Sequence, residues 1–308
     1  PLPLVFMLVF TQMSVGAFLV EQVMYSYFSL FRENIATSVR PLHLSAVLVL
    51  GLLGIGASVF HLGRPMYAFR ALLGLRTSWL SREILAFGIF AAFSVAYVVC
   101  AFVDFFPPSF SKNWEAGLGV AASATGIVAI FCSVMIYVDT RRPCWSLSLT
   151  AAKFSLTALI LGIPISLLIL LVGAATSNEV TVHFVMRQYG WTLCHILLFA
   201  VLAKLCLEGG ILMYLKTRQY TPQKRSALLM VGPLGIVALR RFFFGIVGGI
   251  IMPLLLATEG NFSDAYHPLF VGLMTLLMLG LLTVGELHER HLFFATSVST
   301  RMPGAFTT

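Results

Sequence analysis

FSLTALILGIPISLLILLVGAATS, residues 154–177, is the stretch that decides the fold. It holds no charged residue and is apolar over most of its length. An α-helix needs about 20 mainly apolar residues to cross the hydrocarbon core of a bilayer. The stretch therefore predicts a transmembrane helix.

Seven further stretches have the length and composition of membrane spans. They cover residues 2–31, 42–60, 84–103, 116–138, 189–215, 241–258 and 268–286. We therefore expect an all-α polytopic membrane protein, a bundle of about eight transmembrane helices with short loops, in which residues 1–308 form a single membrane domain. Residues 226–239 are apolar but too short to span, and are predicted to lie at the interface or to extend the seventh helix.

The composition of the whole chain agrees with this interpretation. Of the 308 residues, 59% are hydrophobic and 10% are charged, and the mean hydropathy is +0.94. Soluble domains carry about 25% charged residues. The composition therefore argues against a water-soluble enzyme. The five cysteines form no Cys-x-x-Cys pair, so no metal or iron–sulfur site is expected in this chain.

Lys and Arg fall unevenly between the two sets of predicted loops. The loops after the second, fourth and sixth spans, together with the C-terminal tail, hold 15 of them, and the opposite loops hold 4. Cytoplasmic loops carry the excess of basic residues. We therefore expect both termini and the 2–3, 4–5 and 6–7 loops in the cytoplasm. The net charge of +8 follows from this topology and does not indicate nucleic-acid binding.

The most informative connection joins the second and third spans, HLGRPMYAFRALLGLRTSWLSRE at residues 61–83. His61 ends one predicted helix and Glu83 opens the next, with aromatic residues and four arginines between them. A histidine can hydrogen-bond a carbonyl, a carboxylate can pass protons, and aromatic side chains can hold a flat ring. These are the parts of a quinone site. The alternative is an aromatic belt with snorkelling arginines at the membrane surface.

Four stretches resemble one known family. Residues 61–84, PLVFMLVFTQMSVGAF at 3–18, IYVDTRRPCWS at 136–146 and GELHER at 285–290 are similar to the membrane anchor subunits of molybdopterin oxidoreductases, the dimethyl sulfoxide reductase anchor family. The resemblance covers essentially the whole chain. It implies an anchor for an iron–sulfur subunit and a molybdopterin catalytic subunit, which hold those cofactors, and electron exchange with quinone or menaquinone bound by this chain in a bacterial or archaeal plasma membrane.

The same resemblance implies which residues contact the quinone. His61, Gly63, Phe69 and Glu83 match the family pattern. Some relatives carry a basic residue where this chain has Tyr67. The candidates to replace that charge are Arg64 and Arg70.

A haem b group would need paired histidines at matching depth on helix faces. Of the seven histidines, His43 and His61 lie at opposite ends of the second span and only His195 falls well inside a span. We therefore expect no haem.

Ionisable residues inside spans suggest a function by default. Lys204 and Glu208 lie one helical turn apart, so they could pair with each other or form part of a proton path. Glu21 has no obvious local partner and is the other candidate for a proton path. Glu286 and Arg290 also lie one turn apart and are expected to form a structural pair.

Arg141, Arg142 and Trp145 share the predicted cytoplasmic face with the 2–3 loop. They could dock a partner subunit, or simply anchor the chain at the interface. Both interpretations stay open from the sequence.

Three other functions compete with the favoured one. A polysulfide-reductase type of anchor is closely related. The inferred orientation resembles the anchor of cytoplasmic sulfite-oxidising molybdoenzymes, a sulfite dehydrogenase anchor. A proton-coupled transporter would use Lys204, Glu208 and Glu21, but should show an inverted repeat, and the sequence shows none clearly.

Overall fold

The computed structural model describes residues 2–27, 36–60, 73–102, 108–176, 181–259 and 268–297. Within these residues all regular structure is helical, and eight helical segments are long and apolar enough to cross a membrane. The predicted all-α polytopic membrane fold is therefore confirmed.

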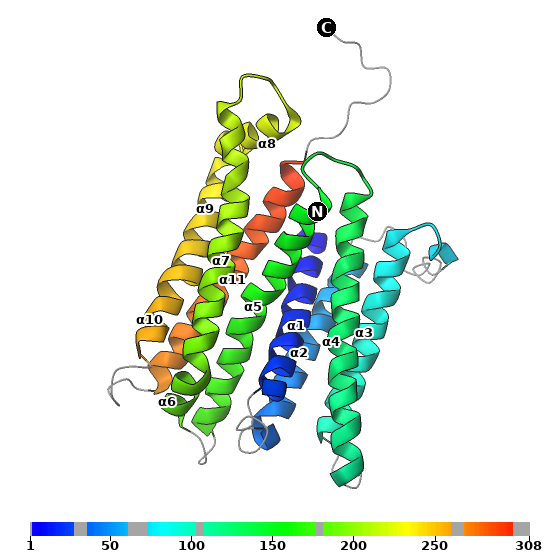
Figure 1. Cartoon of the computed structure of the whole chain (residues 1–308), viewed down its shortest axis with the longest axis vertical. Helices are drawn as coiled ribbons and strands as arrows, with labels where there is room; N and C mark the ends of the chain where they lie inside the picture. Colours follow the sequence, from blue (N-terminus) through cyan, green and yellow to red (C-terminus); the bar gives the residue numbers. More distant parts are fainter. Residues whose placement is uncertain are drawn as a thin grey trace.

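The helices follow the chain in the order in which they are labelled in Figure 1. Their bounds are α1 Leu2–Tyr27, α2 Ala36–Val59, α3 Trp79–Phe102, α4 Pro108–Val138, α5 Leu147–Thr176, α6 Val182–Val185, α7 Trp191–Gly209, α8 Pro222–Val231, α9 Gly235–Ile246, α10 Met252–Glu259 and α11 Pro268–Ala295. The sixth span runs through α6 and α7, and the seventh through α9 and α10.

The centre of the bundle is the contact between α1 and α5. In both spans 72% of the most apolar window is buried inside the protein, a larger share than in any of the other spans found. Gly16 and Gly162 allow the close approach, since a Cβ on Gly16 would lie 1.8 Å from the carbonyl oxygen of Ala158. Small residues let transmembrane helices pack backbone to backbone. Helix α1 also packs against α2, α4 and α11.

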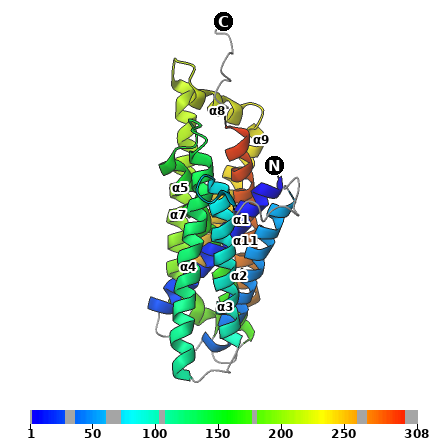
Figure 2. The ribbon, with the colours of Figure 1, turned by 90° about the vertical axis from the view of Figure 1, so that its right-hand side faces the viewer.

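The helices run along the long axis of the molecule, and the short helix α8 lies at one end (Figures 1 and 2). We call this end the α8 end. It also holds the start of α1 and the last residues of α11 (Figure 1). Because consecutive spans alternate in direction, the starts of α3 and α5 and the last residues of α4 belong to the same end.

Two spans are interrupted by a π-helical turn. Met186–Gly190 joins α6 to α7, and Val247–Ile251 joins α9 to α10. Such turns insert one extra residue into the helical repeat and change which side chains face the neighbouring helices. Both interruptions keep the backbone helical, so the spans remain continuous across the bilayer.

Several helices are longer than the sequence predicted. Helix α11 ends at Ala295 and not near Glu286, because the charged side chains beyond Glu286 are paired inside the bundle. Helix α3 begins at Trp79, which places Glu83 one turn inside the helix and not at its opening. The stretch 226–239 divides between α8 and the start of α9, so only its second part extends the seventh span.

Candidate functional site

Glu83 is a buried carboxylate near the α8 end of the bundle. Its residue is 3% exposed, and its Oε1 accepts a short hydrogen bond from the Ser133 hydroxyl on α4. The adjoining first turn of α3 is held by Arg82, which lies over the Trp79 ring at 4.2 Å and donates to the carbonyl of Leu75 at 2.9 Å. Glu83 is therefore a carboxylate that is shielded from solvent in the first turns of α3.

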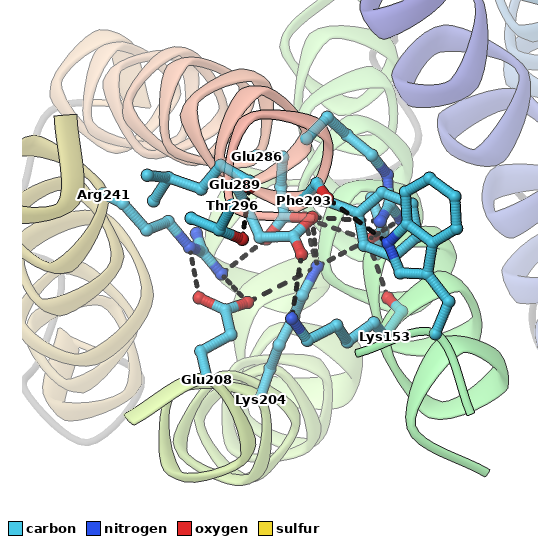
Figure 3. Close-up of polar contacts among 12 residues, drawn as sticks. Lys153, Lys204, Glu208, Arg241, Glu286, Glu289, Phe293 and Thr296 are labelled. Carbon is cyan, nitrogen blue, oxygen red and sulfur yellow. Dashed lines mark hydrogen bonds and ion pairs between the residues drawn. The ribbon is translucent and has the colours of Figure 1, made fainter. Parts of the chain in front are cut away.

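A larger group of charges lies at the same end, between α5, α7, α9 and α11 (Figure 3). We call it the charge cluster. Its members are Lys153, Lys204, Glu208, Arg241, Glu286, Glu289 and Arg290. All except Lys153 are buried. Intramembrane ionisable residues are costly and pair with one another, and this cluster follows that rule across four helices.

Lys204 occupies the middle of the charge cluster. Its Nζ forms a short ion pair with Glu286 and donates to the Thr157 hydroxyl at 2.5 Å. Glu289 and Glu208 lie farther away, at 3.9 and 4.0 Å from the same nitrogen. The local pair predicted between Lys204 and Glu208 is thus the weakest of these contacts, because a carboxylate on α11 lies closer.

Glu208 pairs instead with Arg241 on α9. The Arg241 Nε and Nη2 donate to the two oxygens of Glu208 at 2.8 and 3.0 Å, a bidentate arrangement. The Nη2 also lies 3.0 Å from Oε1 of Glu286. Glu286 is therefore shared between Lys204 and Arg241.

Arg290 lies on the side of the cluster that faces α1. Its Nη2 donates to Gln12 and to Thr157, each at 2.8 Å, and its Nη1 lies 3.0 Å from Oε2 of Glu289. Its guanidinium lies 3.9 Å from the centre of the Phe154 ring. The structural pair predicted between Glu286 and Arg290 is wrong: each residue finds its ion-pair partner elsewhere in the cluster.

A cavity of about 350 Å³ opens beside the charge cluster. Its walls combine aromatic side chains, among them Trp145 and Phe293, with charged ones contributed by the cluster. The charged lining residues are Lys153, Glu208, Arg241 and Glu289. Ligand pockets begin at about 300 Å³ and combine apolar walls with a few placed polar groups. The cavity thus has the size and lining of a site that water or a small ligand can enter.

A second charged group lies towards the opposite end of the bundle. Arg40 on α2 pairs with Glu21 at 2.9 Å and with Glu115 at 2.5 Å, and donates to the Tyr97 hydroxyl at 2.5 Å. Tyr97 in turn contacts both oxygens of Glu21, at 3.0 and 3.1 Å. Glu21, which had no obvious local partner in the sequence, is therefore fixed by a tertiary ion pair.

Comparison with known protein families identifies the family of this chain. The DMSO reductase anchor subunit (DmsC) family matches residues 1–295. The chain belongs to this anchor family. The expected resemblance is thereby confirmed over almost the whole chain.

Three curated relatives are similar to parts of this anchor-family protein. One chain of the anaerobic dimethyl sulfoxide reductase of Haemophilus influenzae is 34% identical over 172 residues, which is 55% of the present protein and 58% of the relative. One subunit of the sulfite dehydrogenase of Allochromatium vinosum is 37% identical over 114 residues, 35% of each protein. The YnfH chain of the anaerobic dimethyl sulfoxide reductase of Escherichia coli K12 is 32% identical over 129 residues, 41% of the present protein and 44% of the relative. The matches thus span between about a third and three fifths of these relatives.

Most of the residues predicted to form the quinone site lie outside the described part of the chain. These residues are His61, Gly63, Arg64, Tyr67, Phe69 and Arg70. Glu83 is the member that the structure describes, and it is buried beside Ser133. The assignment of the other six remains a prediction from the sequence.

The three residues considered for partner docking have different environments. Trp145 is buried, and its ring stacks on Phe293 with centroids 5.1 Å apart. Arg142 lies over the Trp145 ring at 4.6 Å and donates to Ser297. Arg141 is exposed and has a positive φ of 53°. Docking therefore stays a prediction, with Arg141 the most accessible of the three.

Sequence reasoning did not find several members of the buried network. Arg40 and Arg241 count among the basic residues of the predicted loops, Arg241 at the very start of the seventh span, and Glu289 has no predicted role, yet all three are buried and paired. One signal in the sequence was that Arg241 precedes the apolar run FFFGIVGGI without any polar spacer. Gln12, an amide in the middle of an apolar span, carried a similar signal for its bond to Arg290.

Proposed function

We propose that this chain is the quinone-interacting anchor of a molybdopterin oxidoreductase, and passes electrons between the quinone pool and an iron–sulfur subunit. Two observations support the proposal together. The family match spans residues 1–295. A buried carboxylate, Glu83, lies one turn inside α3 and is the last residue of the quinone-site pattern at 61–83 in the sequence. The partner subunits hold the molybdopterin and the iron–sulfur clusters.

In this proposal the residues of the chain bind the quinone ring and move its protons. His61 would hydrogen-bond a quinone carbonyl, and Phe69 would contact the ring face. Glu83 would exchange a proton with the quinone or quinol. The hydrogen bond from Ser133 holds the Glu83 carboxyl in one position. A general acid or base must be held within hydrogen-bond reach of the proton that it transfers.

The test uses Glu83→Gln and His61→Ala in the assembled complex. Both variants should retain the partner subunits and lose quinone-linked electron transfer, while an artificial dye still reacts at the catalytic partner. Glutamine keeps the size of the side chain and can still accept from Ser133, so loss of turnover in Glu83→Gln reports the lost proton exchange. Quinol kinetics unchanged from the parent in both variants would contradict the assignment.

A more specific proposal concerns the partner and the side of the membrane. We propose that the 2–3 loop faces the cytoplasm and that the partner oxidises sulfite, with electrons flowing into the quinone pool. The 15 to 4 distribution of basic residues supports the orientation. The similarity to a subunit of a sulfite dehydrogenase supports the substrate.

Thiol labelling on intact cells tests the orientation. One cysteine replaces Thr77 in the loop before α3 and another replaces Asn113 near the start of α4, both in a Cys144→Ser background. With a membrane-impermeant reagent, Asn113→Cys should label and Thr77→Cys should label only after lysis. The reverse pattern would place the 2–3 loop outside and remove the main support for a cytoplasmic sulfite-oxidising partner.

A further inference from the structure

Two charged side chains in the wall of the cavity have hydrogen-bonding groups that the protein leaves unused. Glu289 is 2% exposed, and in the described part of the chain neither of its oxygens accepts a hydrogen bond. The Lys153 Nζ lies 3.6 Å from Oε1 of Glu289, which is too far for a hydrogen bond. Both residues line the cavity (Figure 3 shows the two side chains). Because buried polar groups nearly always have a partner, we expect a molecule in the cavity to supply one.

Lys153 is also the cation that the charge cluster does not balance. The other six members are buried, and their three positive and three negative charges cancel. The Lys153 side chain is 17% exposed and has no other ion-pair partner among the described residues. The cavity therefore presents a surplus positive charge next to a carboxylate that lacks a hydrogen-bond donor.

The mouth of this cavity lies between α5 and the end of the sixth span. Leu149 and Lys153 line it from α5, and Leu207 and Tyr214 line it from the sixth span. Leu207 and Tyr214 are 40% and 43% exposed, so they lie on the outer surface of the span, which lipid covers. Lys153 follows the start of α5 by six residues, about 9 Å along the helix. This is close to the depth of the headgroup layer, about 5–8 Å. A lipid headgroup can therefore reach Lys153 from the bilayer.

The two unused groups indicate which headgroup fits. A phosphate is the natural partner of the Lys153 ammonium, and basic pockets between transmembrane helices bind anionic headgroups. Glu289 needs a hydrogen-bond donor, but Lys153, Lys204 and Arg290 already lie within 4 Å of its oxygens. A neutral hydroxyl supplies the missing hydrogen bond without adding a fourth positive charge. An ammonium headgroup would add one.

We propose that the cavity binds the headgroup of an acidic phospholipid of the phosphatidylglycerol class, with its phosphate at Lys153 and a headgroup hydroxyl at Glu289. The volume of about 350 Å³ suits a small polar headgroup. Trp145 and Phe293 give the wall apolar surface for the glycerol carbons. The acyl chains remain outside, against the lipid-facing surfaces of α5 and α7. The proposal does not depend on the quinone site.

The first test titrates lipid onto the purified intact complex in detergent and counts the bound molecules by native mass spectrometry. The parent should retain one phosphatidylglycerol in preference to phosphatidylcholine or phosphatidylethanolamine. Lys153→Ala should raise the concentration for half occupancy about tenfold or more, because a charge-assisted hydrogen bond is lost. Lys153→Arg should bind like the parent. Lys216→Ala is the matched control, since this exposed lysine at the same end does not line the cavity, and it should also bind like the parent.

The second test isolates the role of Glu289. Phosphatidylethanol carries the same phosphate but no headgroup hydroxyl, so the parent should bind it about tenfold more weakly than phosphatidylglycerol. Glu289→Gln should retain less of this preference, because a neutral amide oxygen is a weaker acceptor than a carboxylate. A variant of the mouth gives an independent check. Leu207→Trp should block entry and reduce binding, while Leu202→Trp, on the same helix but away from the cavity, should not.

The results that would overturn the proposal are distinct. Retention of phosphatidylcholine and phosphatidylglycerol to the same extent would show that the site does not select an anionic headgroup. A preference for phosphatidylethanolamine would show that Glu289 takes an ammonium. Unchanged binding in Lys153→Ala would place the lipid elsewhere. If the parent retains no lipid, the cavity holds only water; if it instead binds soluble glycerol 3-phosphate, the ligand comes from the aqueous phase. None of these measurements depends on quinone turnover, so failure of the quinone assignment would leave the lipid site intact.

Discussion

Replacement of Arg241 by methionine removes a buried guanidinium from between two carboxylates. The residue is 1% exposed and makes a bidentate contact with Glu208, at 2.8 and 3.0 Å, and a further contact with Glu286 at 3.0 Å. Methionine fills a similar volume without a charge. Glu286 keeps its pair with Lys204, but Glu208 retains only the distant contact to Lys204 at 4.0 Å.

The expected loss of stability follows from these contacts. Removal of one partner from a buried ion pair costs about 3–5 kcal/mol, because the other charge remains buried without compensation. We expect a value near the lower end, about 3 kcal/mol, since Glu208 lines the cavity and water there can solvate it in part. In the double variant Arg241→Met, Glu208→Gln both charges are gone, and about 2 kcal/mol of the loss should be recovered.

The free energy of unfolding is measured in mixed micelles with increasing SDS, followed by tryptophan fluorescence. Arg240→Met is the matched control, because the neighbouring Arg240 is exposed; it should change the free energy by no more than about 0.5 kcal/mol. Equal stabilities for Arg241→Met and Arg240→Met would refute the reasoning. So would a double variant no more stable than Arg241→Met alone.

Two further predictions concern packing and the second charged group. Gly16→Ala should lower the free energy of unfolding by about 1–3 kcal/mol or more, because its Cβ would lie 1.8 Å from the Ala158 carbonyl oxygen. The thermal midpoint in detergent measures this loss. Gly280→Ala is the control: its Cβ would meet open space, so its midpoint should match that of the parent. Arg40→Met should destabilise by about 3 kcal/mol or more, since Arg40 contacts Glu21 and a second carboxylate. Arg40→Lys should recover part of that loss in the same SDS titration, and a lysine variant no more stable than the methionine variant would show that the charge of Arg40 is not what stabilises this site.

The sequence predicted the number of spans because each one is a long apolar run, a signal that depends only on local composition. It could not predict the partners of the charged residues inside them. Lys204 and Glu208 have the correct spacing for a local pair, but Arg241 and Glu286 lie closer in the folded bundle. Partner choice depends on how helices pack, and that is not visible along one helix.

Helix packing also bears on the number of Lys and Arg residues in the loops, from which the orientation in the membrane is predicted. Arg241 and Arg290 on one side, and Arg40 on the other, are buried and paired inside the bundle. With these three removed from the two sets of loop residues, the distribution becomes 13 against 3. The asymmetry remains, so the expected orientation does not depend on residues that the structure places in the interior.

The bond between Gln12 and Arg290 has a consequence for the synthesis of the chain. The two residues are 278 positions apart, and they join α1 to α11. At roughly 5–20 residues per second, the ribosome reaches Arg290 about 14–56 s after Gln12. Glu21, by contrast, meets Arg40 only 19 residues later, within about 1–4 s at the same rate. Glu21 can therefore be paired almost at once by the next helix, while the amide oxygen of Gln12, near the middle of α1, waits for Arg290 until the last span has been inserted.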